Sequence, residues 1–139
     1  AAMLAGVAEF SKSHDQKGYQ ALLELIVAKT AVEAKDYPKA IEALNKVIAA
    51  KPGAGLDVIA TLRVARIQAE QGQIDAALAT LDQVTDKAFF AQRDELKGDF
   101  LVRQGEVEKA KTAYQAAMDN GGVVTSPALK IKLDSLNQA

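Results

Sequence analysis

The single histidine of this 139-residue sequence lies in a polar segment that carries the side-chain types of nucleophilic catalysis. His14 is flanked by Ser11, Ser13 and Asp15. A serine–histidine–aspartate triad needs groups held in a fixed geometry, with the serine on a strained turn. Neighbours in sequence on one loop rarely hold that geometry, so we predict that His14 is a solvated loop residue.

Metal binding and phosphate binding lack their usual residues. The sequence contains no cysteine, and His14 has no second histidine to join it in a metal site. Gly121-Gly122 is not followed by the Lys-Ser/Thr pair of a phosphate-binding loop. We predict that Asp94-Glu95 and Glu106/Glu108 are solvated helix faces and first-turn charges. The sequence therefore predicts no enzymatic activity, no cofactor and no metal.

Composition indicates an ordered protein without a strong preference for polyanions. The chain is 49% hydrophobic and 25% charged, with a formal net charge of −1, so it can form a core and lacks the basic excess of nucleic-acid-binding proteins. No apolar run reaches the roughly 18 residues that cross a bilayer. The chain opens with Ala1-Ala2-Met3, which is compatible with a fragment cut from a longer protein.

Three helix–turn–helix segments can be laid over one another along the chain. Each has a turn followed by a helix with small and large apolar residues at matching places. They recur about every 34 residues, which is the period of the tetratricopeptide repeat (TPR). The copies are residues 34–47, 71–84 and 104–117, aligned on Lys35, Gly72 and Gly105.

The sequence predicts eight helices joined by short turns. Strong helix formers dominate, and the three prolines lie where helices begin or end. Thr125-Ser126, before Pro127, is predicted to cap the last helix. The predicted helices are residues 2–12, 17–35, 37–50, 56–71, 74–84, 88–104, 107–120 and 127–137.

These helices predict an all-α fold, a right-handed TPR superhelix of antiparallel helix pairs ending in a C-terminal capping helix. We expect one domain over residues 1–139. Phe10 is in register with the large residues of the later copies, so residues 2–12 are expected to be the second helix of an incomplete pair. The expected parts are a partial leading repeat at 1–17, repeats at 18–54, 55–87 and 88–122, and the cap at 123–139.

Small residues recur where two helices of a pair must approach closely. They stand at matching positions in each copy, with a large residue beside them. We predict that all of these positions are core. They are Ala28, Ala65 and Gly98 in the first helices, Ala40, Ala77 and Ala110 in the second helices, and the large residues Leu44, Leu81 and Tyr114.

Several segments together resemble one family, the periplasmic domain of the YfgM-like ancillary subunits of the SecYEG translocon. The Leu-Arg-x-Ala-Arg run at 62–66 and the Pro-Ala-Leu ending at 127–129 are its more specific parts. The likeness covers roughly residues 9–136. The remaining segments that carry it are residues 75–82, 96–99 and 109–114.

This resemblance implies a protein held in the inner membrane by one N-terminal helix, with its repeat domain in the periplasm. It implies association with the SecYEG translocon and with a membrane-anchored, PpiD-type periplasmic chaperone, assisting newly exported chains. The family's anchor is not in this sequence, as expected of a soluble piece cut just past it. The alternative is a soluble TPR scaffold or adaptor for another complex or regulatory partner.

A partner-binding site is predicted on the concave face, which the first helix of each pair lines. Its mixture of apolar and charged groups suits a weak or adaptable peptide contact. Repeat domains that clasp a C-terminal carboxylate use lysine and asparagine where this chain has Leu25 and Lys29, which argues against recognition of a cytosolic chaperone tail. The alternative is that Leu22, Leu25 and Leu62 pack internally and the arginines are solvated. The predicted site residues are Leu22, Leu25, Lys29, Ile59, Leu62, Arg63, Arg66, Glu95, Asp99 and Arg103.

Overall fold

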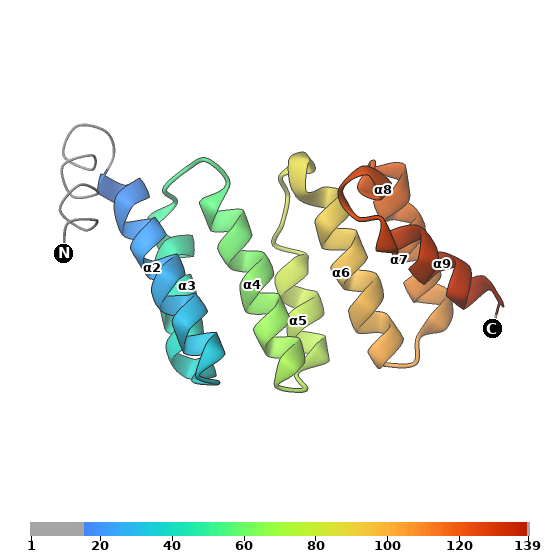
Figure 1. The fold of residues 1–139 in the computed structure, drawn as a ribbon, viewed down its shortest axis with the longest axis horizontal. Helices are drawn as coiled ribbons and strands as arrows, with labels where there is room; N and C mark the ends of the chain where they lie inside the picture. The colour runs from blue at the N-terminus through green and yellow to red at the C-terminus, as the bar shows by residue number, and fades with distance from the viewer. Residues whose placement is uncertain (1–15, 139) are drawn as a thin grey trace. The chain divides into compact units, whose positions relative to one another are not determined.

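The computed structural model describes residues 16–138, and their regular structure is entirely helical (Figure 1). This confirms the all-α repeat fold. The helices form two compact units, divided within α4 after Val64. The elements are α2 (Gln16–Glu33), α3 (Tyr37–Ala50), α4 (Leu56–Glu70), α5 (Ile74–Leu81), the 3₁₀ turn η1 (Lys87–Phe89), α6 (Phe90–Arg103), α7 (Val107–Asp119), α8 (Gly122–Thr125) and α9 (Ala128–Gln138).

Seven of the predicted helices correspond to observed ones, while the predicted helix 2–12, with Phe10, and the loop residue His14 lie outside the described residues. The prediction for 74–84 is too long, because α5 ends at Leu81. There the amides of Gln83 and Val84 donate to carbonyls three residues back, at 3.1 and 3.0 Å, which closes a tighter turn.

The short helix α8 was not predicted. Gly121 adopts a φ of 81°, which reverses the chain after α7, and the next four residues then form a single helical turn. Ser126 was predicted to cap the last helix, and it does so through its backbone carbonyl while its hydroxyl bonds elsewhere. Its carbonyl accepts the Leu129 amide at 3.1 Å, while its hydroxyl donates to Glu95 at 2.9 Å.

The three repeat copies share one turn geometry. The aligned residues Lys35, Gly72 and Gly105 all have left-handed backbones, with φ of 59°, 81° and 79°. In each turn the amide of this residue donates three residues back, at 2.9–3.0 Å, and the next amide donates five residues back, at 2.8–2.9 Å. This pair of bonds defines the Schellman helix end, in which glycine is favoured. Lys35 therefore has a strained backbone where the other two copies have glycine.

In the first unit, α2 and α3 pack as an antiparallel pair (Figure 1). The buried face of α2 consists mainly of alanines, which lets the α3 backbone approach closely. Leu44 and Val47 fill the space from α3 and are each 1% exposed. The buried residues are Ala21, Leu25, Ala28 and Ala31 on α2, and Ala40, Ala43, Leu44 and Val47 on α3.

In the second unit, α6 and α7 form a helix pair, and α9 packs on α7. α6 approaches α7 closely at Gly98, where a Cβ atom would collide with the Tyr114 ring. Tyr114 also belongs to the apolar cluster that receives Leu129 and Leu133 from α9. All nine small and large packing positions predicted from the repeat are buried, which confirms that prediction.

Polar bonds close the second unit at the ends of its helices. The Thr80 hydroxyl donates to the Gln68 amide oxygen at 2.6 Å, which joins α5 to the C-terminal half of α4. Arg103 donates from Nη1 to the Ala69 carbonyl at 3.2 Å and is the second donor to this carbonyl at the end of α4, which also accepts the Gly72 amide. Within residues 16–138, no helix is both long and apolar enough to cross a membrane.

Candidate functional site

Two carboxylates on α6 lie at the centre of a group of polar contacts in the second unit. Glu95 and Asp99 are four residues apart, which places them on one face of the helix. Lys132 reaches them from α9, with Nζ 2.8 Å from Glu95 Oε2 and 3.1 Å from Asp99 Oδ1. The side chains are 16% exposed for Glu95 and 32% for Asp99, so water screens these contacts less than it would on an open surface.

Two hydroxyls add to these contacts. Ser126 Oγ donates to Glu95 Oε2 at 2.9 Å, and Tyr114 Oη donates to Asp99 Oδ1 at 2.6 Å. We call Glu95, Asp99, Tyr114, Ser126 and Lys132 the Lys132 network. It ties α6, α7, the α8–α9 connection and α9 together, so the cap is held by polar bonds as well as by its apolar face.

The network changes the protonation of two of its members. Burial, followed by the hydrogen bond to Asp99 and the negative charges of Asp99 and Glu95, raises the pKa of the Tyr114 hydroxyl above its usual range. Burial alone would lower the pKa of Lys132, but its bonds to the carboxylates and their charges outweigh that effect and raise it. Tyr114 therefore remains a donor and Lys132 remains a cation at neutral pH.

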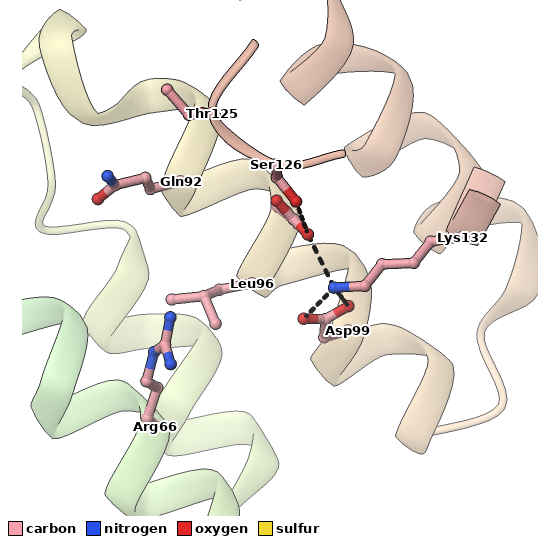
Figure 2. Close-up of a pocket in the computed structure, with 8 residues that line it drawn as sticks. Arg66, Gln92, Leu96, Asp99, Thr125, Ser126 and Lys132 are labelled. Carbon is pink, nitrogen blue, oxygen red and sulfur yellow. Dashed lines mark hydrogen bonds and ion pairs between the residues drawn. The ribbon is translucent and has the colours of Figure 1, made fainter. Parts of the chain in front are cut away.

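A pocket of about 430 Å³ opens beside this network, and Figure 2 shows it in close-up. Leu96 lies between the Arg66 guanidinium on α4 and the Lys132 network (Figure 2). Among residues 16–138, Arg66 has no hydrogen bond or ion pair, and it is exposed. The lining residues are Arg66, Gln92, Glu95, Leu96, Asp99, Thr125, Ser126 and Lys132.

Three predicted site residues, Arg66, Glu95 and Asp99, meet in this pocket. Arg103 does not line it, because its guanidinium is bonded to the end of α4. Leu96, a buried residue that was not predicted for the site, forms the apolar part of the wall.

The other predicted residues lie in the first unit. Leu25 and Leu62 are only 8% and 6% exposed, so for them the alternative of internal packing applies and a partner cannot reach them directly. Leu22 is 47% exposed, so a partner can reach part of its side chain. Lys29 and Arg63 are exposed and Ile59 is half-buried, so these three are accessible to differing degrees.

One interpretation of the carboxylates was wrong. Asp94 is 6% exposed rather than solvated, because Arg93 folds back to place Nε 3.0 Å from its Oδ1. The same arginine donates to the Val84 carbonyl at 3.1 Å and lies over the Phe90 ring, 3.9 Å from its centroid. Glu95 is also withdrawn from solvent, whereas the pair Glu106/Glu108 is exposed as predicted.

Lys132 and Ser126 were missed by sequence reasoning. Lys132 stands next to Leu133 on α9, off the apolar stripe, and this position carries no sign of a partner thirty-three residues away on α6. The sequence feature that could have pointed to this site is the pair of acidic residues Glu95 and Asp99, which stand four residues apart on α6. Two carboxylates one turn apart repel each other weakly, so a cation placed between them is favourable.

Comparison with known proteins decides the family. A family model described as a tetratricopeptide repeat-like domain matches residues 1–138. The chain belongs to this TPR-like family. The structure agrees with this family, because it has the same turn geometry at Lys35, Gly72 and Gly105 and buried small residues where paired helices meet.

The TPR-like chain is also similar to proteins named ancillary SecYEG translocon subunit, as the resemblance in its sequence predicts. The protein of Aggregatibacter actinomycetemcomitans is 34% identical over 92% of this chain and 63% of its own length. That of Haemophilus influenzae is 31% identical over 95% of this chain and 65% of its own length. That of Escherichia coli is 28% identical over 94% and 64%. The chain thus spans less than two thirds of each relative.

Proposed function

We propose that this TPR-like domain is a non-enzymatic binding module that associates with the SecYEG translocon at the bacterial inner membrane. The observation that carries the proposal is similarity, over at least 92% of the chain, to three proteins named ancillary SecYEG translocon subunit. The architecture supports it, because stacked helix pairs present extended surfaces that suit protein partners.

We further propose that the domain lies on the periplasmic side and that its partners include a PpiD-type chaperone and exported chains. This finer proposal rests on the resemblance of the 62–66 run and the 127–129 ending. Accessible side chains suited to such contacts are Leu22 and Lys29 on α2 and Arg63 and Arg66 on α4. Arginine is favoured at interfaces because its planar fork pairs with carboxylates while its stem packs on apolar groups.

Direct binding to purified SecYEG tests the proposal. The immobilised chain is exposed to SecYEG in lipid nanodiscs, with empty nanodiscs of the same lipid as the control, and binding is followed by biolayer interferometry. Saturable binding to SecYEG above the empty nanodiscs is expected. The double variant Arg63→Glu/Arg66→Glu, checked by its melting curve, is expected to bind more weakly while remaining folded.

The second candidate is a soluble scaffold or adaptor that uses the same repeat for another complex. The same assay separates the two candidates. A folded chain that gives no signal on SecYEG nanodiscs, and none on a PpiD-type chaperone, would refute translocon association and leave the scaffold.

A further inference from the structure

We propose that the pocket beside the Lys132 network binds an extended peptide segment through a carboxylate held by Arg66. This inference rests on the proposed function as a protein-binding module and names the chemistry that one of its pockets recognises. The carboxylate is either an aspartate or glutamate side chain or a C-terminal carboxylate, since both present the same two oxygens.

The first argument is the state of the charged groups that line the pocket. Lys132 is occupied by Glu95 and Asp99, at 2.8 and 3.1 Å. Arg66 has no acceptor within residues 16–138, although a guanidinium has five N–H donors in a planar fork. A carboxylate is the group that fits this fork with two parallel hydrogen bonds.

The second argument is the orientation that the charges impose. The Lys132 network contains two carboxylates and one ammonium, so it retains one net negative charge at the end of the pocket away from Arg66 (Figure 2). An anion is therefore drawn to the Arg66 end and repelled from the network. Glu95 uses Oε2 for both of its hydrogen bonds, and Oε1 remains able to accept an amide N–H from the ligand.

The third argument is the shape and the wall of the pocket. A volume of about 430 Å³ is more than one side chain fills, so the pocket has room for more than a single carboxylate. Leu96 lies between the two charged ends, where it offers apolar contact to the residue beside the carboxylate. The exposed Gln92 amide adds a donor and an acceptor for a peptide backbone, so the wall fits an extended segment better than a free anion.

Nuclear magnetic resonance of the ¹⁵N-labelled chain tests this site with three synthetic peptides. The first is acetyl-Ala-Leu-Glu-Leu-Ala-amide, which carries a side-chain carboxylate. The second replaces its glutamate by glutamine and has no carboxylate, and the third is the glutamine peptide with a free C-terminus. We expect the first or the third peptide, or both, to shift the Arg66 Nε–Hε and Gln92 amide signals, and the second to leave them in place.

Two matched variants assign the effect to Arg66. Arg66→Gln should weaken binding of the carboxylate peptides about tenfold or more, the loss expected for charge-assisted hydrogen bonds. Lys97→Gln removes one positive charge at an exposed position of α6 that does not line the pocket, and should leave binding unchanged. Equal melting curves establish that both variants are folded.

The outcomes separate this inference from the proposed function. Binding of the carboxylate-free peptide as tightly as the others, or full affinity in Arg66→Gln, would overturn the carboxylate site, as would no shift with any peptide. If the chain still binds SecYEG nanodiscs in that case, the proposed function stands without this pocket. A response to the first peptide alone identifies an acidic side chain as the ligand, and a response to the third alone identifies a chain terminus.

Discussion

The contact between Gly98 and Tyr114 gives the sharpest test of the repeat packing. In the first two copies the matching pairs are Ala28 with Leu44 and Ala65 with Leu81, all four of them buried. In the third copy the large residue is an aromatic ring and the small residue is glycine. A Cβ atom added by Gly98→Ala would overlap three atoms of that ring, so the ring or the helix would have to move.

The expected cost follows from three contributions. Overpacking of a filled core costs about 1–3 kcal/mol. Movement of the ring also strains the 2.6 Å hydrogen bond from Tyr114 to Asp99, and bonds of this charged kind are worth about 1.5–3 kcal/mol. Alanine in a helix interior regains about 1 kcal/mol relative to glycine. The balance is about 0–2 kcal/mol if the hydrogen bond survives intact and about 1.5–5 kcal/mol if it is lost completely. For a bond that is strained but not lost, we expect Gly98→Ala to lower the free energy of unfolding by about 1–3 kcal/mol.

A double-mutant cycle measured by urea unfolding isolates this contact. Tyr114→Leu recreates the leucine of the other copies, and in that background Gly98→Ala should cost nothing or stabilise by about 1 kcal/mol. The coupling between the two sites should then reach roughly 1–3 kcal/mol. Equal effects of Gly98→Ala in both backgrounds would refute the close contact, and with it the account of why this helix position must be small.

Three further experiments test other parts of the structure. Lys35→Gly should stabilise the chain by about 1 kcal/mol and Gly105→Ala should destabilise it by about 1–2 kcal/mol, because both positions have left-handed backbones. No atom crowds Gly105, so its substitution tests the backbone alone. A lower melting temperature for Lys35→Gly than for Gly105→Ala would refute this. Lys132→Met should lower the midpoint of urea unfolding, because it removes the cation from Glu95 and Asp99. Lys130→Met removes only an exposed ion pair and should leave the midpoint nearly unchanged. Equal midpoints for the two variants would show that the Lys132 network does not stabilise the fold. Because the folded chain holds the Tyr114 pKa above 10.0, the unfolded chain loses this proton first as pH rises. Stability should therefore fall from about pH 10 upwards, and Tyr114→Phe should make that fall shallower in unfolding curves measured across the alkaline range.

Helices and turns could be predicted from the sequence because their causes are local. The 34-residue period, the positions of proline and glycine, and the alternation of small and large residues are all properties of short segments. They located the turn residues Lys35, Gly72 and Gly105 and the buried pair Gly98 and Tyr114. Even the strain at Lys35 is visible once the copies are aligned, since the other two have glycine at that place.

The boundary between core and surface within one helix was less predictable. Leu22 and Leu25 are the same residue type on the same helix, yet one is 47% exposed and the other 8%. Asp94 and Glu95 are neighbours that were both predicted to be solvated, yet one is buried against Arg93 and the other is bound by Lys132. Burial depends on which face a neighbouring helix covers, and the residue type alone does not state that.

The sequence by itself determined the all-helical repeat, its turns and the small positions at which paired helices meet. Tertiary structure alone decided that Lys132 pairs with Glu95 and Asp99, because α9 packs on α7 after the unpredicted turn at α8 and so carries Lys132 to the carboxylates of α6. It also decided that Arg66 faces this group across a pocket while Arg103 is bonded to a helix end. Charges far apart in sequence interact according to the distance between them in space, and that distance is fixed only when the helices have packed.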